Sequence, residues 1–448
     1  MNRIERWRAS GAEVSVAGLG RSGLAAARLL GDAGIAVYAS DASPKASGGA
    51  PIPGVTVEVG RHDLERIRRS AALIVSPGIP PDAEVVASSR AAGVEIVAEA
   101  QLGLDHLGGI PQLMVTGTNG KTTTTALLDH VMRAAGRNSV AAGNIGTPLA
   151  AVAIREVKPA WLAVELSSFQ LHDMPDVRPT VGVLTNLAPD HLDRYPGLDA
   201  YYADKALLFA NATGSSIWVT NLDDPASRSM VAAVRGRHLT FSVAHGVRAD
   251  GWFDRDADLL MLAGRPLLPR AELALLGDHN VANALAAALA LHVTAMSHDE
   301  IAGGLRTFAA LPHRMEPIVE VNGVLWINDS KATNVASTAV ALQAMTRPYV
   351  VMLGGRHKGE PYTALATALR ARAHAVVAYG EAAGLITTDL ADVIPVLRGS
   401  TFDEAMELAR GRVPAGGAVL LSPACSSYDM FNNYEERGAR FRTIVEAW

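Results

Sequence analysis

Cysteine is the scarcest residue in this chain of 448 residues, with Cys425 as its single example. One thiol cannot form an internal disulfide, so a secreted scaffold held together by disulfides is excluded. A cysteine-based zinc finger is excluded for the same reason. No histidine or asparagine forms an obvious catalytic partnership with Cys425, and we interpret it as a small packing residue rather than a nucleophile.

Long apolar runs and an excess of basic charge are also missing. The longest uninterrupted apolar run, residues 284–291, is far shorter than the roughly 18–20 residues that span a bilayer. The N-terminus is charged and has no apolar stretch of signal-peptide length. There are 40 Lys and Arg against 45 Asp and Glu, a net charge of −5, whereas nucleic-acid-binding proteins are usually basic. We therefore expect a soluble, cytoplasmic protein with no membrane insertion and no nucleic-acid partner.

What the sequence does contain is an α/β pattern. The chain is longer than the roughly 250–300 residues that one core supports, so two or three domains are expected. Short β-branched apolar runs alternate with longer Ala- and Leu-rich stretches, which predicts parallel sheets layered with helices. Strands are predicted at residues 13–17, 35–40, 73–75, 113–115, 161–164, 181–184, 349–353, 375–379 and 418–421. Helices are predicted at residues 21–33, at 199–211, and from the glycine turn after strand 113–115 to about residue 135. Domain boundaries near Glu99 and Leu311 give domains of residues 1–99, 100–311 and 312–448.

The first motif, Gly18-Leu19-Gly20-Arg21-Ser22-Gly23, is a G-x-G-x-x-G sequence between a predicted strand and a predicted helix. Asp41, at the end of the next strand, stands where an acidic residue can hold a ribose hydroxyl. The pattern fits NAD or FAD. However, glycines before a helix N-terminus accept any pyrophosphate, and tight packing alone would also explain them. Of these three interpretations we favour a nucleotide diphosphate other than NAD or FAD.

The second motif, Thr116-Gly117-Thr118-Asn119-Gly120-Lys121-Thr122-Thr123, also lies between a strand and a helix. Backbone N–H groups of such a loop bind phosphate oxygens, Lys121 adds a positive charge, and Thr122 offers a hydroxyl to magnesium. The spacing departs from G-x-x-x-x-G-K-[ST], because Gly117 is the only earlier glycine. The strand–loop–helix context favours ATP binding over a chance Gly-Lys-Thr turn.

Polar residues follow two more predicted strands. Glu165 directly follows the strand 161–164, where a carboxylate can hold magnesium opposite the phosphate loop or simply cap a helix. The segment 186–195 contains an Asp-His-x-Asp cluster that could bind a metal or orient a substrate. Lys205 lies on the next predicted helix, and its chemistry alone favours a solvated surface lysine.

Three further polar clusters, residues 277–283, 311–314 and 328–334, could each be ordinary caps or turns. In their order and spacing, however, the phrases TGTNGKTT, GNIG, ELSSFQL, DHLDRY, GDHNVANALAA, PHR, NDSKATN and LSPACSS resemble the Mur ligases of bacterial cell-wall synthesis. The resemblance covers residues 18–441 and points to the branch that adds D-glutamate. It implies a UDP-binding Rossmann-like domain, a central P-loop ATPase-like domain and a C-terminal Rossmann-like domain that brings the amino acid. The loop at Gly18 would then receive UDP rather than NAD.

The resemblance also implies a reaction. ATP, UDP-N-acetylmuramoyl-L-alanine and D-glutamate would be the substrates, and we expect a monomer. The substrate carboxylate would attack the γ-phosphate to form an acyl phosphate, and the glutamate amine would then displace phosphate. Lys121 and two magnesium ions would neutralise the anions that must approach each other. Such a ligase serves peptidoglycan synthesis and, through it, cell shape and division.

The family's site residues carry over position by position. The catalytic residues would be Lys121, Glu165, His191 and Lys205. Thr122 and Glu165 would hold one magnesium ion, and His191 and Lys205 the second, with Lys205 carbamylated because an ammonium cannot ligate a cation. The ATP-binding residues would be Gly117, Thr118, Asn119, Gly120, Lys121, Thr122, Thr123, Asn280, Asn283, Arg314 and Asp329. The uridine-linked substrate would contact Arg21, Ser22, Asp41, Gly78, Asn144 and His191. D-Glutamate would contact Thr333, Lys358, Ser427 and Tyr434, which suit its side-chain carboxylate.

Two positions depart from the family pattern. The loop Gly354-Gly355-Arg356-His357-Lys358 is basic where the family commonly has an acidic residue, and Tyr434 stands where a phenylalanine is expected. Both bear on amino-acid specificity rather than on the reaction class. A folylpolyglutamate-type ligase would lack ELSSFQL and NDSKATN, and a dehydrogenase would leave Lys121 and Glu165 idle. A non-enzymatic nucleotide-binding module would not need three converging polar clusters.

Overall fold

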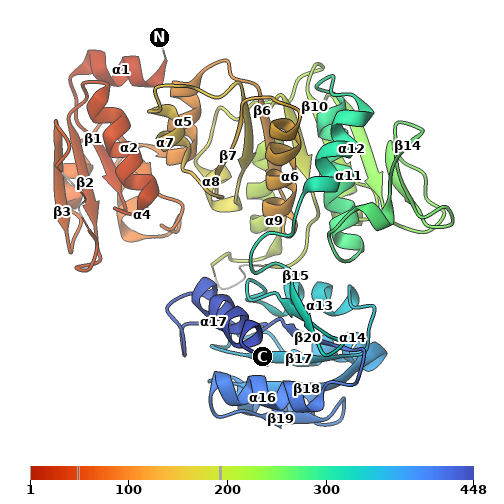
Figure 1. Ribbon diagram of the computed structural model, residues 1–448. Helices are drawn as coiled ribbons and strands as arrows, with labels where there is room; N and C mark the ends of the chain where they lie inside the picture. The colour runs from red at the N-terminus through yellow and green to blue at the C-terminus, as the bar shows by residue number, and fades with distance from the viewer. Residues whose placement is uncertain (1, 48, 50, 191–193) are drawn as a thin grey trace. The chain divides into compact units, whose positions relative to one another are not determined.

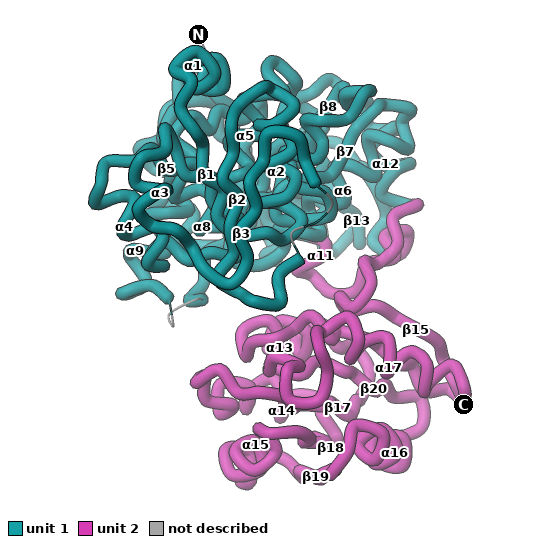
Figure 2. Tube along the Cα trace, turned by 90° about the vertical axis from the view of Figure 1, so that its left-hand side faces the viewer, with its two compact units in different colours: residues 1–270, 282–306 teal, residues 271–281, 307–448 magenta. Residues whose placement is uncertain are grey.

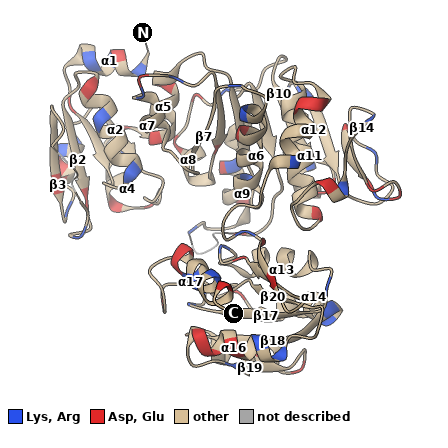
Figure 3. Ribbon diagram, viewed as in Figure 1, with Lys and Arg blue, Asp and Glu red and all other residues tan. Residues whose placement is uncertain are grey.

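The computed structural model describes residues 2–47, 49, 51–190 and 194–448. The chain divides into two compact units, unit 1 (residues 1–270 and 282–306) and unit 2 (residues 271–281 and 307–448), shown in Figure 2. Basic and acidic residues are interspersed over the ribbon of each unit (Figure 3). Unit 1 holds two sheets and unit 2 holds one. Within the described ranges, no helix is long and apolar enough to cross a membrane.

The first sheet of unit 1 has five parallel strands in the order β3-β2-β1-β4-β5 (Figure 1). The strands are β1 (Val14–Ala17), β2 (Val37–Asp41), β3 (Val55–Val59), β4 (Ala72–Val75) and β5 (Glu95–Ala98). Their helices are α1 (Arg3–Ser10), α2 (Arg21–Asp32), α3 (Leu64–Ile67) and α4 (Glu84–Ala91). The chain leaves β1 toward β2 on one side and returns to β4 on the other. This reversal opens a crevice at the carboxyl ends of β1 and β4, the usual place for a ligand in such a sheet.

The second sheet of unit 1 has nine strands in the order β14-β13-β12-β11-β10-β9-β6-β8-β7. They are β6 (Gln112–Thr116), β7 (Ser139–Gly143), β8 (Trp161–Glu165), β9 (Val181–Leu184), β10 (Ile217–Asn221), β11 (Arg237–Ser242), β12 (Gly251–Asp254), β13 (Leu259–Leu262) and β14 (Arg265–Pro269). All pairings are parallel except β12–β13 and β13–β14, which form an antiparallel extension. Because β8 and β9 flank β6, the carboxyl ends of these three strands lie side by side.

Helices and short turns connect the strands of the second sheet. They are α5 (Glu99–Leu107), α6 (Lys121–Ala134), α7 (Leu149–Ala153), α8 (Ser168–His172), α9 (Leu198–Ala206), η1 (Leu207–Phe209), α10 (Pro225–Val231), η2 (Arg270–Glu272), α11 (Asp278–His292) and α12 (His298–Thr307). The predicted helix 199–211 is thus α9 followed by one 3₁₀ turn.

Unit 2 is built on a six-stranded sheet in the order β15-β16-β20-β17-β18-β19. Its strands are β15 (Glu316–Val321), β16 (Val324–Asn328), β17 (Tyr349–Gly354), β18 (Ala373–Tyr379), β19 (Val396–Arg398) and β20 (Ala418–Leu421). Its helices are α13 (Val335–Gln343), η3 (Tyr362–Leu365), α14 (Ala366–Arg372), α15 (Ala383–Leu390), α16 (Phe402–Arg412) and α17 (Tyr434–Glu446). Only the β15–β16 pair is antiparallel. Cys425 is fully buried in the core beside this sheet, as the packing interpretation predicts.

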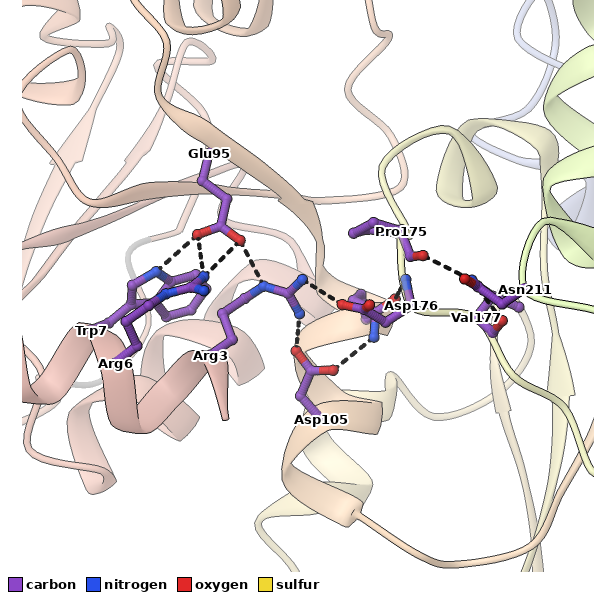
Figure 4. Close-up of polar contacts among 10 residues, drawn as sticks. Arg3, Arg6, Trp7, Glu95, Asp105, Pro175, Asp176, Val177 and Asn211 are labelled. Carbon is purple, nitrogen blue, oxygen red and sulfur yellow. Dashed lines mark hydrogen bonds and ion pairs between the residues drawn. The ribbon is translucent and has the colours of Figure 1, made fainter. Parts of the chain in front are cut away.

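One hydrophobic core and one charged network join the two sheets of unit 1. The core runs without a break from Trp7 in α1 to Trp218 in β10. At its margin, the guanidinium of Arg3 contacts Glu95, Asp105 and Asp176, which come from β5, α5 and the loop after α8 (Figure 4). Arg3 is only 9% exposed, so solvent screens this network weakly. The predicted α/β fold with Rossmann-like and P-loop ATPase-like sheets is confirmed, while the domain boundaries at 99 and 311 stay predictions.

A buried carboxylate marks the junction between the two sheets. Glu99, the first residue of α5, is 1% exposed, and its Oε1 accepts a hydrogen bond of 2.6 Å from the backbone N–H of Ala150 in α7. Its Oε2 is buried and has no partner among the described residues. Burial raises the pKa of Glu99 to about 7. The folded protein therefore prefers this carboxyl protonated, and charging it costs stability.

Glu99→Gln should reduce the pH dependence of stability. A carboxyl whose pKa is raised on folding contributes its stability at low pH and loses it as the pH rises through the folded pKa near 7. In this protein the loss from pH 5 to pH 8 is about 2 kcal/mol. Thermal unfolding should therefore be measured at both pH values for Glu99→Gln and for the native chain. The stability of Glu99→Gln relative to the native chain should be higher at pH 8 than at pH 5. Glu65→Gln, at an exposed carboxylate of α3, should not show this gain, and identical pH profiles for all three proteins would contradict the role given to Glu99.

Candidate active site

A cavity of about 890 Å³ lies at the crevice of the first sheet and extends to the loop after β7. The five described residues predicted to contact the uridine-linked substrate all line it: Arg21, Ser22, Asp41, Gly78 and Asn144. They come from the ends of β1, β2, β4 and β7, so both sheets of unit 1 contribute. The size and the mixed polar and apolar lining suit a ligand larger than a single phosphate.

The glycine loop at this cavity is held by close packing and by Asp41. A Cβ atom on Gly23 would lie 1.7 Å from the carbonyl oxygen of Gly18, so only glycine fits there. One carboxylate oxygen of Asp41 accepts from the backbone N–H of Leu19 at 2.8 Å, and the other from that of Ser43 at 2.8 Å. Asp41 therefore braces the loop while facing the cavity.

His62 also lines the cavity, and sequence reasoning missed it. Its Nδ1 lies 2.8 Å from the hydroxyl of Ser40, and burial lowers its pKa, which favours a neutral imidazole. No sequence signal could have identified it, because a single histidine in a loop belongs to none of the motifs.

The phosphate loop joins β6 to α6. Gly120, just before the helix, has a φ of +83°, and a Cβ there would lie 2.2 Å from the side-chain oxygen of Asn283, so a larger residue would displace Asn283. The ammonium of Lys121 donates to the carbonyl oxygens of Gly117 (2.9 Å) and Thr118 (2.7 Å) and so lies back over the loop. At the N-terminus of a 14-residue helix, this arrangement favours an anion.

Lys205 is not the surface lysine that its chemistry alone suggested. It lies in α9, is 1% exposed, and donates to the same carbonyl oxygen of Gly117 at 2.6 Å. Its ammonium lies 4.7 Å from the centroid of the Tyr201 ring. Burial, followed by the charge of Lys121, lowers the pKa of Lys205 well below its ordinary value. The surroundings of this amine therefore favour its neutral form over the ammonium.

Glu165 is the last residue of β8 and is 2% exposed. Its Oε1 accepts a hydrogen bond of 2.9 Å from the side-chain amide of Asn144, whereas its Oε2 is buried without a partner among the described residues. The alternative role of helix cap is wrong, because Ser167 and Gln170 form the capping box of α8. A buried, partly unsatisfied carboxylate oxygen beside a phosphate loop fits a magnesium ligand.

The remaining predicted metal ligands are only partly described. The predicted site residue His191 lies outside the described residues. Within the described part of the chain, no group of three or more His, Cys, Asp or Glu side chains is arranged to hold a metal ion. Of the four predicted metal ligands, Thr122 and Glu165 carry oxygen donors as they stand.

The predicted ATP contacts outside the phosphate loop are divided between the units. Asn283 belongs to unit 1 and lies against Gly120, whereas Asn280, Arg314 and Asp329 belong to unit 2. Asp329 accepts from the Ser422 hydroxyl at 2.8 Å and from the backbone N–H of Met315 at 3.1 Å. Burial raises its pKa to about 7, although these hydrogen bonds and Arg314 oppose the rise.

Unit 2 brings two of the predicted D-glutamate contacts together. The ammonium of Lys358 lies 3.5 Å from the hydroxyl of Thr333. Ser427 is 2% exposed in the loop after β20. Tyr434, at the start of α17, receives a hydrogen bond of 3.0 Å from Lys331, a lysine that the sequence did not single out.

The two basic residues before Lys358 contact other side chains rather than the predicted D-glutamate contacts. Arg356 pairs with Glu381 at 3.1 Å, and the Nδ1 of His357 lies 3.1 Å from the hydroxyl of Tyr362. Both side chains therefore already have partners. Lys358 is the residue of this loop that lies beside Thr333.

The two sheets of unit 1, the phosphate loop and the third α/β sheet define the class of protein. Family models described as "Mur ligase MurD-like, N-terminal domain", "Mur ligase middle domain" and "Mur ligase, glutamate ligase domain" match residues 12–98, 115–291 and 313–425. The chain belongs to the Mur ligase family.

Within the family, the chain is similar to UDP-N-acetylmuramoylalanine–D-glutamate ligases. It is 38% identical to that of Acidobacterium capsulatum, over 98% of this chain and 96% of the relative, and 39% identical to that of Salinibacter ruber, over 96% and 97%. Solved structures share the fold at lower identity. A pseudomurein peptide ligase type C from Methanothermus fervidus (21% identical) covers 97% of this chain and 99% of its own, with a TM-score of 0.62. The UDP-N-acetylmuramate–alanine ligase of Thermotoga maritima (18% identical) gives the same coverage and TM-score.

Proposed function

We propose that this protein is an ATP-dependent ligase that joins D-glutamate to UDP-N-acetylmuramoyl-L-alanine in peptidoglycan precursor synthesis, releasing ADP and phosphate. The observation that carries the proposal is the identity of 38–39% over nearly the whole length of relatives with that name. The reaction takes two steps. The substrate carboxylate attacks the γ-phosphate of ATP, giving an acyl phosphate and ADP, and the amine of D-glutamate then forms the amide as phosphate leaves.

The cavity of the first sheet is our proposed site for the uridine-linked substrate. The helix N-terminus behind Gly20 faces the diphosphate, with Arg21 and Ser22 supplying charge and a hydroxyl, while Asp41 and Gly78 border the uridine. Asn144 lines the cavity and also holds Glu165, so the muramoyl end of the substrate would point toward the phosphate loop.

The loop Gly117–Thr123 is our proposed site for the ATP phosphates. Its backbone N–H groups and Lys121 bind and orient the β- and γ-phosphates and neutralise the charge that the attacking carboxylate brings. Thr122 and Glu165 would hold one magnesium ion, and His191 with Lys205 the second. Magnesium would supply further positive charge to the phosphate oxygens. Asn280, Asn283, Arg314 and Asp329 complete the proposed ATP contacts.

The surroundings of the Lys205 amine support the proposed carbamate. Burial lowers the pKa of Lys205 and so favours its neutral amine, and a neutral amine adds to CO₂ to give a carbamate and a proton. The product is an anion, which replaces the repulsion between Lys205 and Lys121 by attraction. It retains one N–H for the carbonyl oxygen of Gly117 and gains two hard oxygen donors of the kind that magnesium prefers.

D-Glutamate would bind in unit 2 through Thr333, Lys358, Ser427 and Tyr434. Lys358 supplies the one flexible cation of this set, and the hydroxyls accept or donate around the side-chain carboxylate. The hydroxyl of Tyr434 adds a polar contact that a phenylalanine would lack.

We further propose that the enzyme acts as a monomer in the cytoplasm, where ATP and uridine-linked precursors occur. The proposed domain boundaries at 99/100 and 311/312 follow the end of β5 at Ala98 and the polar turn before β15.

The function is tested by measuring phosphate release and product mass with ATP, UDP-N-acetylmuramoyl-L-alanine and each of several amino acids in turn. Phosphate release should require all three substrates, with D-glutamate preferred, because the proposed residues bind one substrate each and react only in combination. Turnover with a folate and L-glutamate, or with a nicotinamide cofactor in place of ATP, would contradict the proposal.

Lys205→Ala should lose nearly all ligase activity and regain part of it in the presence of acetate. A small carboxylate can occupy the space left by the side chain and replace the carbamate oxygens. Activity of the native enzyme should also fall at low pH, since protonation of the amine removes the carbamate. The matched control is Lys121→Ala, because that lysine has to remain a cation and acetate cannot replace it. Rescue of both variants, or full activity of Lys205→Ala without acetate, would remove the carbamate from the mechanism.

Lys358→Ala should raise the KM for D-glutamate at least tenfold and leave the KM for ATP within about twofold. The lost contact is a charge-assisted one, and such contacts are worth roughly 1.5–3 kcal/mol. Arg356→Ala, two residues earlier in the same loop, removes a cation that is paired with Glu381 and should change neither constant much. If Lys358→Ala raised both KM values alike, Lys358 would lie away from the amino acid.

A further inference from the structure

Among the residues that the structure describes, Arg437 is the largest charged side chain that is fully buried, with an exposed fraction of 0%. It lies in the first turn of α17. Its guanidinium donates to the hydroxyl of Ser330 (2.9 Å) and to the carbonyl oxygens of Ser330 (2.8 Å), Cys425 (3.2 Å from each terminal nitrogen) and Gly354 (3.4 Å). A guanidinium has five N–H groups, so every donor is used.

The acceptors of Arg437 belong to three separate loops. Ser330 follows β16, Cys425 follows β20 and Gly354 ends β17, and these strands are neighbours in the sheet. Their carboxyl ends therefore lie at one edge, the edge where parallel sheets bind ligands. Arg437 ties the three loops to one another and to α17. Ser330 adds to this bracing, since its hydroxyl lies 2.8 Å from the carbonyl oxygen of Tyr434.

Burying a guanidinium costs more free energy than burying an apolar side chain in the same core. The five hydrogen bonds go to four acceptor atoms, none of them a carboxylate oxygen, so the buried positive charge is held mainly by carbonyl dipoles, and the carboxyl of Asp329 interacts with it electrostatically. A buried charge costs free energy that a well-packed apolar side chain would not. The planar guanidinium, however, donates hydrogen bonds in fixed directions and can therefore orient several backbone segments at once, which an apolar side chain cannot do.

The loops that Arg437 holds carry all the proposed contacts to D-glutamate. Thr333 lies three residues after Ser330, Ser427 two after Cys425, Lys358 four after Gly354, and Tyr434 three before Arg437 itself. Two further links support the same geometry. Arg356 and Ser426 exchange backbone hydrogen bonds of 2.9 and 3.2 Å, and the backbone N–H of Ala424 donates to the oxygen of Ala332 at 3.0 Å.

We propose that Arg437 is a positioning residue for the incoming amino acid: it touches no substrate and sets the relative placement of the three loops that bind it. This inference rests on the proposed function. It predicts that loosening the guanidinium contacts weakens binding of D-glutamate selectively, because small displacements of several weak contacts add up in one pocket.

The experiment compares Arg437→Met, which removes the donors, and Arg437→Lys, which keeps the charge but not the fork of donors. The KM for D-glutamate should rise at least tenfold in Arg437→Met and by a smaller factor in Arg437→Lys, with the KM for ATP and for the uridine-linked substrate within twofold. The preference for D-glutamate over L-glutamate should fall in the same order. The matched control is Arg440→Met on the same helix, whose guanidinium pairs with Asp403 at the surface and whose loss should leave all three constants unchanged.

A lower melting temperature with unchanged KM for D-glutamate would overturn the inference and reduce Arg437 to a structural residue. If Arg437→Met does not fold, Ser330→Ala decides, since it deletes one acceptor of the guanidinium; its KM for D-glutamate should rise several-fold, and no change would overturn the inference. The native enzyme separates this result from a failure of the proposed function. If it ligates a different amino acid, the same KM comparison applies to that amino acid, and if it ligates none, both proposals fail.

Discussion

Two lysine amines approach one backbone oxygen in unit 1, and much of the site depends on how the repulsion between their charges is relieved. Lys121 and Lys205 both donate to the carbonyl of Gly117. Two ammonium ions so close together repel strongly in an interior of low dielectric constant. Burial, followed by the charge of Lys121, lowers the pKa of Lys205, and loss of its proton would relieve this repulsion. Burial of α9 against the loop thus gives two chemically identical side chains different surroundings: Lys205 is 1% exposed, whereas Lys121 lies at the N-terminus of α6.

The sequence allowed much of this geometry to be predicted because parallel sheets place chemistry at predictable points. Arg21, Asp41, Gly78 and Asn144 each follow a short apolar strand, and the carboxyl ends of those strands meet at a single cavity. The same reasoning located Glu165 and the phosphate loop on adjacent strands, β8 and β6. Strand ends and glycine spacing are local signals, and they were enough for the two glycine loops and Glu165, whereas Asn144 was assigned only through the resemblance to the Mur ligases, because the strand before it, β7, was not predicted.

Other features depend on contacts that no local pattern encodes. The burial of Lys205 arises from the packing of α9 on the phosphate loop, and a sequence window around Lys205 reads as an ordinary exposed helix. Arg437 gathers three loops that lie far apart along the chain, so its role emerges only when β16, β20 and β17 become neighbours. Some motif residues serve the fold instead: Ser167 and Gln170 begin α8, and Asn334 caps α13. The antiparallel strands β12–β14 were missed, and so were β3, β5, β7, β10, β11, β15, β16 and β19.

Two edge strands in unit 1, β14 and β3, differ in how readily a strand of another chain could pair with them. β14 lies at one edge of the nine-stranded sheet and contains Pro266 and Pro269, which have no backbone N–H to donate. β3, at an edge of the five-stranded sheet, has no proline, and it exposes Val57 and Val59 by 36% and 39%. An unprotected apolar edge is a template for strand addition. Of these two edges, β3 therefore offers a better template for an added strand than β14 does.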